Sequence, residues 1–173
     1  MWDKEVHGMR GMRLYKREIT DPETFREILE ECEVVRLGIM DEEGMFIVPV
    51  NYGFEFFPDV DGMRLSLYIH GAKEGRKADA FAQNSSVAVE MDCRHEVIKG
   101  DYTCSYSYAY RSIMGNGTIR MLTKDDEKVH GLTRIMEHMA PGTDIRFLPE
   151  MLERTAVYQI DLDHFTGKER KKK

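Results

Sequence analysis

A series of short, β-branched and apolar segments separated by tight turns constrains the fold of this chain more than any other feature. The segments lie at residues 34–40, 45–54, 63–69, 87–91, 110–122 and 155–162. Glycine, asparagine and aspartate residues fill the turns between them, as in hairpins. The pattern predicts a six-stranded antiparallel barrel of the α+β, mainly β class. A doubly wound parallel sheet would need strands that alternate regularly with long helices.

Helices are predicted around these strands. Asp21 caps a helix that has proline at its first position and an apolar stripe, and a short helix follows Gly75. Thr123 is the expected cap of a third helix, whose first turn carries three carboxylates, and a helical turn is expected at 149–153. We expect these helices to lie at the periphery of the barrel.

Composition predicts one domain without linkers. The 173 residues are 42% hydrophobic, which suffices for one buried core and is short for two. We expect a flexible N-terminal extension over 1–11, the domain over 12–167, and a solvated basic tail over 168–173.

Charge and apolar patterning restrict the expected partners and location. The net charge of −6 disfavours general binding of nucleic acid. No apolar run is long enough to cross a bilayer, and the first residues lack the apolar block of a secretion signal. The three cysteines form no paired framework, which favours free thiols in a reducing compartment. We therefore expect a cytoplasmic protein with neither nucleic-acid nor membrane partners.

The segment 68–77 has the pattern of a phosphate-binding turn. An apolar strand runs into a glycine-containing turn, and Gly75 immediately precedes a predicted helix whose free N–H groups attract anions. Lys73, Arg76 and Lys77 supply positive charge at this helix start. A solvated basic turn without a ligand is the alternative interpretation. His70 ends the strand beside the turn, where it could bond a cofactor or substrate, or have a purely structural role.

A second candidate segment contains a proline within a predicted strand. Pro49 cannot donate to a ladder, so the strand must lie at a sheet edge or be interrupted. A planar heterocycle could bond the backbone around Val50 and Asn51, with Tyr52 or apolar neighbours against one face of the ring. On this segment alone, an ordinary edge-strand proline is the simpler interpretation.

A third segment, 106–112, combines three tyrosines at alternate positions with Arg111 and Ser112. This mixture suits stacking on a flat ring and binding of phosphate. An aromatic ladder on the barrel exterior or a subunit contact is equally consistent, and both hold if a ligand lies between subunits. Cys93, His95 and Cys104 match no zinc-binding spacing, so no metal site is predicted.

These segments, in this order, resemble the flavin-binding split-barrel proteins related to pyridoxamine 5′-phosphate oxidase, and in particular the nitroimidazole-resistance branch. The resemblance rests on Arg36-Leu-Gly38, Val48-Pro-Val-Asn-Tyr-Gly53, His70-Gly-Ala-Lys-Glu-Gly-Arg-Lys77 and Tyr110-Arg-Ser-Ile-Met-Gly-Asn-Gly117. It extends over about residues 12–167.

The resemblance implies a homodimer of six-stranded split barrels with FMN in two clefts at the subunit interface. Lys73, Arg76 and Lys77 would bind the phosphate, and 49–52 would line the isoalloxazine ring. Arg111 and Ser112 would approach from the same chain or from the partner, and His70 would face the cofactor pocket as the candidate catalytic residue.

The expected function is that of an FMN-dependent oxidoreductase, a two-electron reductase of a small aromatic or nitroaromatic acceptor such as a nitroimidazole. FMN would supply the redox chemistry. The chain lacks the arginine-rich substrate contacts and C-terminal segment of true pyridoxamine phosphate oxidases, so vitamin B6 oxidation is not expected. The alternatives are a flavin-binding module without turnover, or a split barrel that uses haem or a deazaflavin.

Overall fold

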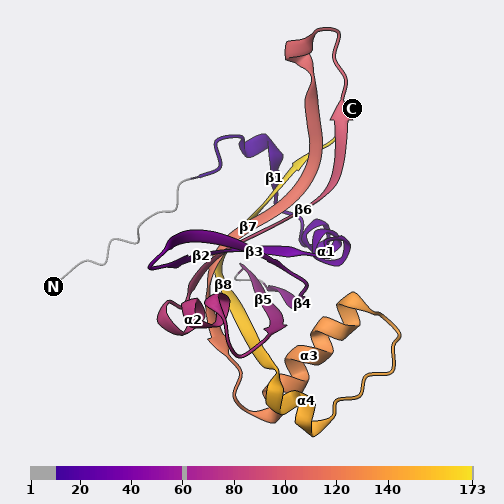
Figure 1. Ribbon diagram of the computed structural model, residues 1–173. Coiled ribbons are helices and arrows are strands. Elements are labelled where there is room, and N and C mark those ends of the chain that lie inside the picture. The colour runs from indigo at the N-terminus through magenta and orange to yellow at the C-terminus, as the bar shows by residue number, and fades with distance from the viewer. Residues whose placement is uncertain (1–10, 60–61, 173) are drawn as a thin grey trace, which may run out of the picture.

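The computed structural model describes residues 11–59 and 62–172, which form eight β-strands, four α-helices and two short 3₁₀ helices (Figure 1). The strands are β1 (Glu18–Ile19), β2 (Val35–Asp41), β3 (Gly44–Val50), β4 (Gly53–Asp59), β5 (Gly62–Gly71), β6 (Ser86–Ile98), β7 (Ser107–Met121) and β8 (Ala156–Arg170). The helices are α1 (Pro22–Glu31), α2 (Arg76–Gln83), α3 (Asp125–Met139) and α4 (Pro149–Arg154), with 3₁₀ turns at Tyr15–Arg17 and Thr103–Ser105. Residues 1–10 of the predicted extension lie outside the described residues.

The strands form one antiparallel sheet in the order β3-β2-β6-β7-β8-β5-β4, with β1 paired to β8. The strands β3 and β4 are its two edges, and each contains a proline, Pro49 and Pro58. The prediction that Pro49 lies in an edge strand is therefore confirmed. A proline is tolerated there because no neighbour requires its missing N–H.

The mainly β, antiparallel class predicted from the sequence is confirmed, although the sheet has more than the six strands expected. The predicted strand over 45–54 divides at Asn51, and β4 begins at Gly53. A turn was predicted at 58–62, but Pro58 and Asp59 still pair with β5. The two additional strands, β1 and β4, are short or carry turn-forming residues, which hides them in the sequence.

The strand β8 organises the sheet. It pairs with β5 through 156–161, with β7 through 158–170 and with β1 at 167–168. The predictions that this strand ends at 162 and that a solvated tail begins at 168 are therefore wrong. Backbone pairing with β7 and β1 orders this charged segment, and such pairing cannot be inferred from local composition.

Of the four described α-helices, α1 alone begins with a side-chain capping bond. The Asp21 carboxylate accepts hydrogen bonds from the Thr24 backbone N–H at 3.0 Å and hydroxyl at 2.8 Å, as the predicted cap requires. The predicted cap at Thr123 is wrong, because Lys124 occupies the N-cap position of α3 and makes no side-chain capping bond. Carboxylates at 125–127 complement the start of the helix dipole instead.

The core lies between α1 and the inner face of the sheet. Phe25, Ile28 and Leu29 of α1 are buried there against inward-facing strand residues. Helix α3 packs across β4 and β5 (Figure 1), and it approaches β4 so closely that only glycine fits at position 53. None of the described helices is long and apolar enough to cross a membrane.

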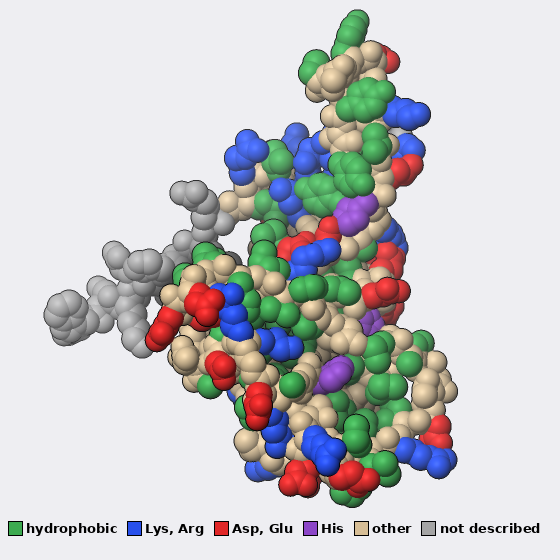
Figure 2. Space-filling view, in the orientation of Figure 1, with side chains coloured by type: hydrophobic (Ala, Val, Ile, Leu, Met, Phe, Trp, Pro, Cys, Tyr) green, Lys and Arg blue, Asp and Glu red, His purple; other side chains and the backbone are tan. Residues whose placement is uncertain are grey.

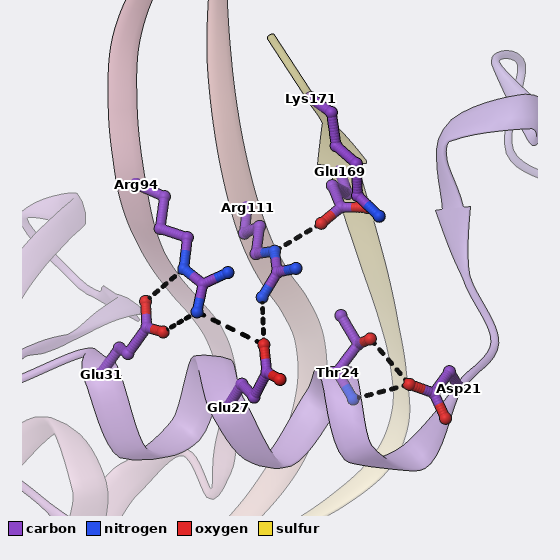
Figure 3. Close-up of polar contacts among 8 residues, drawn as sticks. All are labelled: Asp21, Thr24, Glu27, Glu31, Arg94, Arg111, Glu169 and Lys171. Carbon is purple, nitrogen blue, oxygen red and sulfur yellow. Dashed lines mark hydrogen bonds and ion pairs between the residues drawn. The ribbon is translucent and has the colours of Figure 1, made fainter. Parts of the chain in front are cut away.

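The strands β6 and β7 continue past the body of the molecule as a projecting hairpin (Figure 1). A bulge between Cys93 and Glu96, with Arg94 at a φ of 55°, marks its base. Arg94 and Arg111 form ion pairs with Glu27, Glu31 and Glu169 of α1 and β8 (Figure 3). These contacts join the base of the hairpin to α1 and β8.

Replacement of Gly53 by alanine tests the packing of α3 on β4. A Cβ atom at this position would lie 2.2 Å from the Arg134 carbonyl carbon, so the helix must move. We expect Gly53→Ala to lower the free energy of unfolding by about 2 kcal/mol or more, as measured by urea denaturation. Gly11→Ala is the matched control, because no atom lies within 4 Å of the added carbon. Equal stability of the two variants would contradict this packing.

Candidate functional site

The turn between β5 and α2 places two polar groups together without partners. The Nδ1 atom of His70 is buried and has no hydrogen-bond partner within residues 11–59 and 62–172. Lys77, in the first turn of α2, is half-buried, and no carboxylate of the described chain pairs with it. Buried polar groups are normally satisfied. The pair therefore marks a place where an external acceptor would be stabilised.

The backbone of this turn favours an anion as well. Gly75 is the N-cap of α2 with a φ of 107°, a conformation that costs little only for glycine, and it supplies no side-chain cap. The first N–H groups of α2 therefore lack a capping side chain, and the helix dipole is positive there. Gly71 leaves room for the lysine, because a Cβ atom at 71 would lie 3.0 Å from the Lys77 Nζ atom.

Burial and charge set the protonation of both groups. Burial lowers the pKa of the His70 imidazole, and the nearby Lys77 charge lowers it further. Burial also lowers the pKa of the Lys77 ammonium group. An anion bound between them would favour both charged forms and raise both pKa values. The local charge and burial therefore favour an anion over a cation at this turn.

Arg76, also predicted to bind phosphate, is engaged elsewhere. Its Nε and Nη2 atoms donate to the two Asp41 carboxylate oxygens at 2.6 and 2.9 Å, and its Nη1 lies 3.5 Å from Glu43. The guanidinium also lies 4.1 Å from the centre of the Phe46 ring. Of the three predicted cations, Lys77 adjoins His70, Arg76 joins the β2–β3 turn, and Lys73 is solvent-exposed.

The proline-containing segment only partly matches its predicted role. Pro49 is exposed, Val50 is half-buried, and the Asn51 side chain contacts the Met139 sulfur. Tyr52 is fully buried, and its hydroxyl donates to the Leu29 carbonyl oxygen at 2.9 Å. The prediction that the Tyr52 ring lines a cofactor is therefore wrong. Its aromatic side chain fills the core, which a local motif cannot reveal.

Arg111 and the turn at His70 lie at opposite ends of β8. His70 pairs with Val157 and Arg111 pairs with Glu169, so the two pairing positions are twelve residue steps apart on β8, roughly 40 Å along a straight strand. The Arg111 guanidinium binds Glu27 and Glu169 (Figure 3). Ser112 pairs with Lys168 in the sheet. Arg111 and Ser112 are therefore remote from the turn at 70–77 in their own chain, and their approach to a cofactor, from the same chain or from the partner, stays a prediction.

The predicted tyrosine cluster lies on the projecting hairpin. Of its three tyrosines, Tyr106 and Tyr108 are exposed and Tyr110 is half-buried, and the His95 ring stacks on Tyr108 at a centroid distance of 5.8 Å. Apolar side chains cover much of this hairpin surface (Figure 2). The arrangement is consistent with each predicted role, an exterior ladder, a subunit contact or a stacking surface, since the ring faces are accessible.

The three cysteines are free, and burial raises the pKa of the Cys32 and Cys93 thiols. Such thiols are poor nucleophiles near neutral pH. No group of three or more histidine, cysteine or carboxylate side chains within the described residues is arranged to hold a metal ion.

Comparison with known proteins identifies the family. Residues 21–169 match the family model described as pyridoxamine 5′-phosphate oxidase. The chain therefore belongs to the pyridoxamine 5′-phosphate oxidase family, as its motifs predicted. A search of curated protein sequences found no match.

Solved structures support this assignment and indicate the branch. A proposed 5-nitroimidazole antibiotic resistance protein from Bacteroides thetaiotaomicron is 27% identical, with a TM-score of 0.73 over 87% of this chain and 85% of that one. The flavocytochrome Anf3 from Azotobacter vinelandii has a similar fold. It is 19% identical, with a TM-score of 0.75 over 94% of this chain and 73% of that one. An FAD- and haem-binding protein from Mycobacterium smegmatis also has a similar fold. It is 19% identical, with a TM-score of 0.76 over 90% of this chain and 74% of that one. The predicted split-barrel class and the resemblance to the nitroimidazole-resistance branch are thus confirmed.

The titration of His70 tests the unsatisfied site. Because its pKa is lower in the folded than in the unfolded state, the unfolded chain binds more protons. The contribution of neutral His70 to the free energy of unfolding is fully present above the unfolded-state pKa near 6.5. It is lost as pH falls through the folded-state pKa. In phosphate-free buffer, wild type should lose more unfolding free energy between pH 8 and pH 5 than His70→Gln does. A folded-state pKa at or above 6.5, measured by NMR, would contradict this environment.

Proposed function

We propose that this protein binds FMN with the phosphate at the turn between β5 and α2. The observation that carries the proposal is the pairing of a half-buried Lys77 with an unpartnered His70 Nδ1 at a glycine-capped helix start. A phosphate dianion supplies the acceptors and the countercharge that both groups lack. Lys77 would bind it as a point charge, and the first N–H groups of α2 would direct their dipoles at it.

The flavin ring would extend from this turn along β3, past Pro49, Val50 and the Asn51 backbone. We propose that a second copy of the chain completes the cleft. An apolar cavity of about 670 Å³ lies on the outer face of β3, β2, β6 and β7, where Met45, Ile47 and Met114 are exposed. Such a surface suits burial between subunits. Because Arg111 and Ser112 are remote from the turn in their own chain, any contribution they make to a cofactor would come from the partner.

Bound FMN would supply two-electron redox chemistry. A bound phosphate would raise the pKa of the His70 imidazole from its lowered value, so this residue could take up or release a proton near neutral pH. His70 is therefore the candidate catalytic group, and the half-exposed apolar residues of β3 would limit access of water to the ring.

The proposed reaction is two-electron reduction of a small aromatic or nitroaromatic acceptor. Its support is the similarity to the Bacteroides protein, which is described as a proposed 5-nitroimidazole antibiotic resistance protein. The names of the other two structures mention haem with a flavin, so a haem- or deazaflavin-binding barrel is the competing hypothesis, together with a flavin module without turnover. An absorption spectrum of the purified protein separates these cofactors. The cytoplasmic location stays a prediction from the sequence.

Substitution of the two neighbouring cations tests the phosphate site. Lys77→Ala should weaken FMN binding by about 1.5–3 kcal/mol, the range for hydrogen bonds to charged groups, in a titration of flavin fluorescence at fixed ionic strength. Arg76→Ala should cost less than about 1 kcal/mol, because Asp41 already holds this exposed guanidinium.

Lys124→Ala, an exposed lysine at the start of α3, is the control for a general change in charge, and its FMN affinity should equal that of wild type. The phosphate would have to bind elsewhere if Lys77→Ala bound FMN as tightly as Lys124→Ala, or if Arg76→Ala had the larger effect.

Anaerobic mixing of the reduced FMN complex with a 5-nitroimidazole tests turnover. Oxidation should be faster than that of free reduced FMN, and His70→Ala should slow it about 100-fold, a typical loss for a general acid–base group. Flavin affinity of this variant is measured in parallel, so that weak binding is not mistaken for slow chemistry. A rate equal to that of free FMN would instead support a flavin-binding module without turnover.

A further inference from the structure

A cavity of about 600 Å³ lies between α1, the edge strand β4 and the C-terminal half of α3, and we refer to it as the α1–α3 cavity. Its volume is within the range of sites for small organic molecules. Figure 1 shows β4 running between these two helices. On β4 the cavity is lined by residues 54–57, which pair with 64–67 of β5. None of the residues that line it belongs to the turn at 70–77, so it is separate from the proposed flavin site.

The wall that β4 contributes is aromatic. Phe54 is half-buried, Phe56 is buried in the core, and Phe57 is half exposed. His138 closes one end, because its Nδ1 atom donates to the Tyr52 carbonyl oxygen at 2.7 Å and its ring meets Phe54 edge-on at 5.4 Å. A flat aromatic ring would therefore find apolar contacts in a fixed geometry.

Two guanidinium groups with unused donors come from the facing helices. Arg26 of α1 lies over Phe56, 5.5 Å from the ring centre, and pairs with no carboxylate within the described part of the chain. Arg134 of α3 binds Glu137 through Nη2 at 2.8 Å, while its buried Nε atom has no acceptor among the described residues. Guanidinium groups match carboxylates through paired N–H donors. Both arginines thus keep N–H groups that have no acceptor among the described residues.

The acidic groups in the cavity are mostly engaged. The two oxygens of Glu55 lie 2.7 Å from the Tyr68 hydroxyl and 2.9 Å from His130 Nε2. Glu137 is held by Arg134. Glu30 is exposed and has no ion-pair partner within the described residues. Glu30 therefore lacks a partner that would offset its charge, and a bound anion would be repelled by Glu30 as well as by Glu55, whose hydroxyl partner is neutral.

The geometry points to the α1–α3 cavity as a second ligand site, one that takes a small aromatic carboxylate. The ligand ring would lie against Phe54 and Phe57, and its carboxylate would bind Arg26 and Arg134. Arg26 would remain over Phe56, and this contact would orient the paired N–H donors of its guanidinium group toward the cavity.

Isothermal titration with phenylacetate tests the inference on the full chain saturated with FMN. We expect one molecule to bind per chain with a Kd of roughly 0.1–1 mM. Cyclohexylacetate, which lacks the aromatic ring, should bind more weakly, and benzylamine, which reverses the charge, should not bind measurably. Arg26→Gln and Arg134→Gln should each weaken phenylacetate binding about tenfold or more.

Arg64→Gln is the matched control, because Arg64 also lies over a phenylalanine, 5.8 Å from the Phe57 ring centre, but does not line the cavity. Its phenylacetate affinity should equal that of wild type. Glu30→Gln should tighten binding about two- to fivefold by removing a repulsive charge. Phe57→Ser, at a half-exposed position, replaces the arginine variants if these fail to fold, and it should also weaken binding.

The inference is independent of the flavin proposal. Lys77→Ala without FMN should bind phenylacetate like wild type, whatever the outcome for the flavin. The inference would be overturned by no heat of binding at 5 mM ligand, by preference for benzylamine, or by equal affinities in Arg26→Gln and Arg64→Gln. Tighter binding of benzylamine in wild type than in Glu30→Gln would assign the cavity to a cation instead.

Discussion

The pairing of β8 with three other strands is the constraint on which the rest of the structure depends. Its first half pairs with β5 and so fixes the turn that carries His70, while its second half pairs with β7 and β1 and fixes Arg111. Twelve residue steps along β8 separate the positions that pair with these two residues, so they lie far apart within one chain. A ligand that contacts both must therefore bridge two chains. The proposed pairing of two chains rests on the exposed apolar surface over β3 and β7.

Local charge balance distinguishes groups that build the fold from groups available to a ligand. Arg76, Arg94 and Arg111 each lie beside carboxylates that neutralise them, and they join distant elements of the chain. Lys77 and His70 are partly removed from water without such compensation. Desolvation without a partner has a free-energy cost, which a native fold retains mainly where binding offsets it. The same criterion draws attention to Arg26 and Arg134 in the α1–α3 cavity.

The sequence predicted the features that local chemistry controls. Apolar alternation located most strands, Asp21 located the start of α1, and the glycines with Lys77 located the turn after β5. Features that depend on tertiary packing were missed. The position of an aromatic residue in the sequence does not show whether its side chain enters the core, as that of Tyr52 does, or faces a ligand. The partners of Arg111 lie 84 residues before it and 58 after it, and no pattern in the chain reveals them. Likewise, the α1–α3 cavity combines residues from three separated elements.

Comparison of FMN with riboflavin tests the central claim most directly, because the two molecules differ only in the phosphate group. If the turn between β5 and α2 holds that phosphate, wild-type protein should bind FMN at least about tenfold more tightly than riboflavin in the same fluorescence titration. This preference should largely disappear in Lys77→Ala, since the charged partner is removed. Equal affinities of wild type for FMN and riboflavin would contradict the assignment of the turn as a phosphate site.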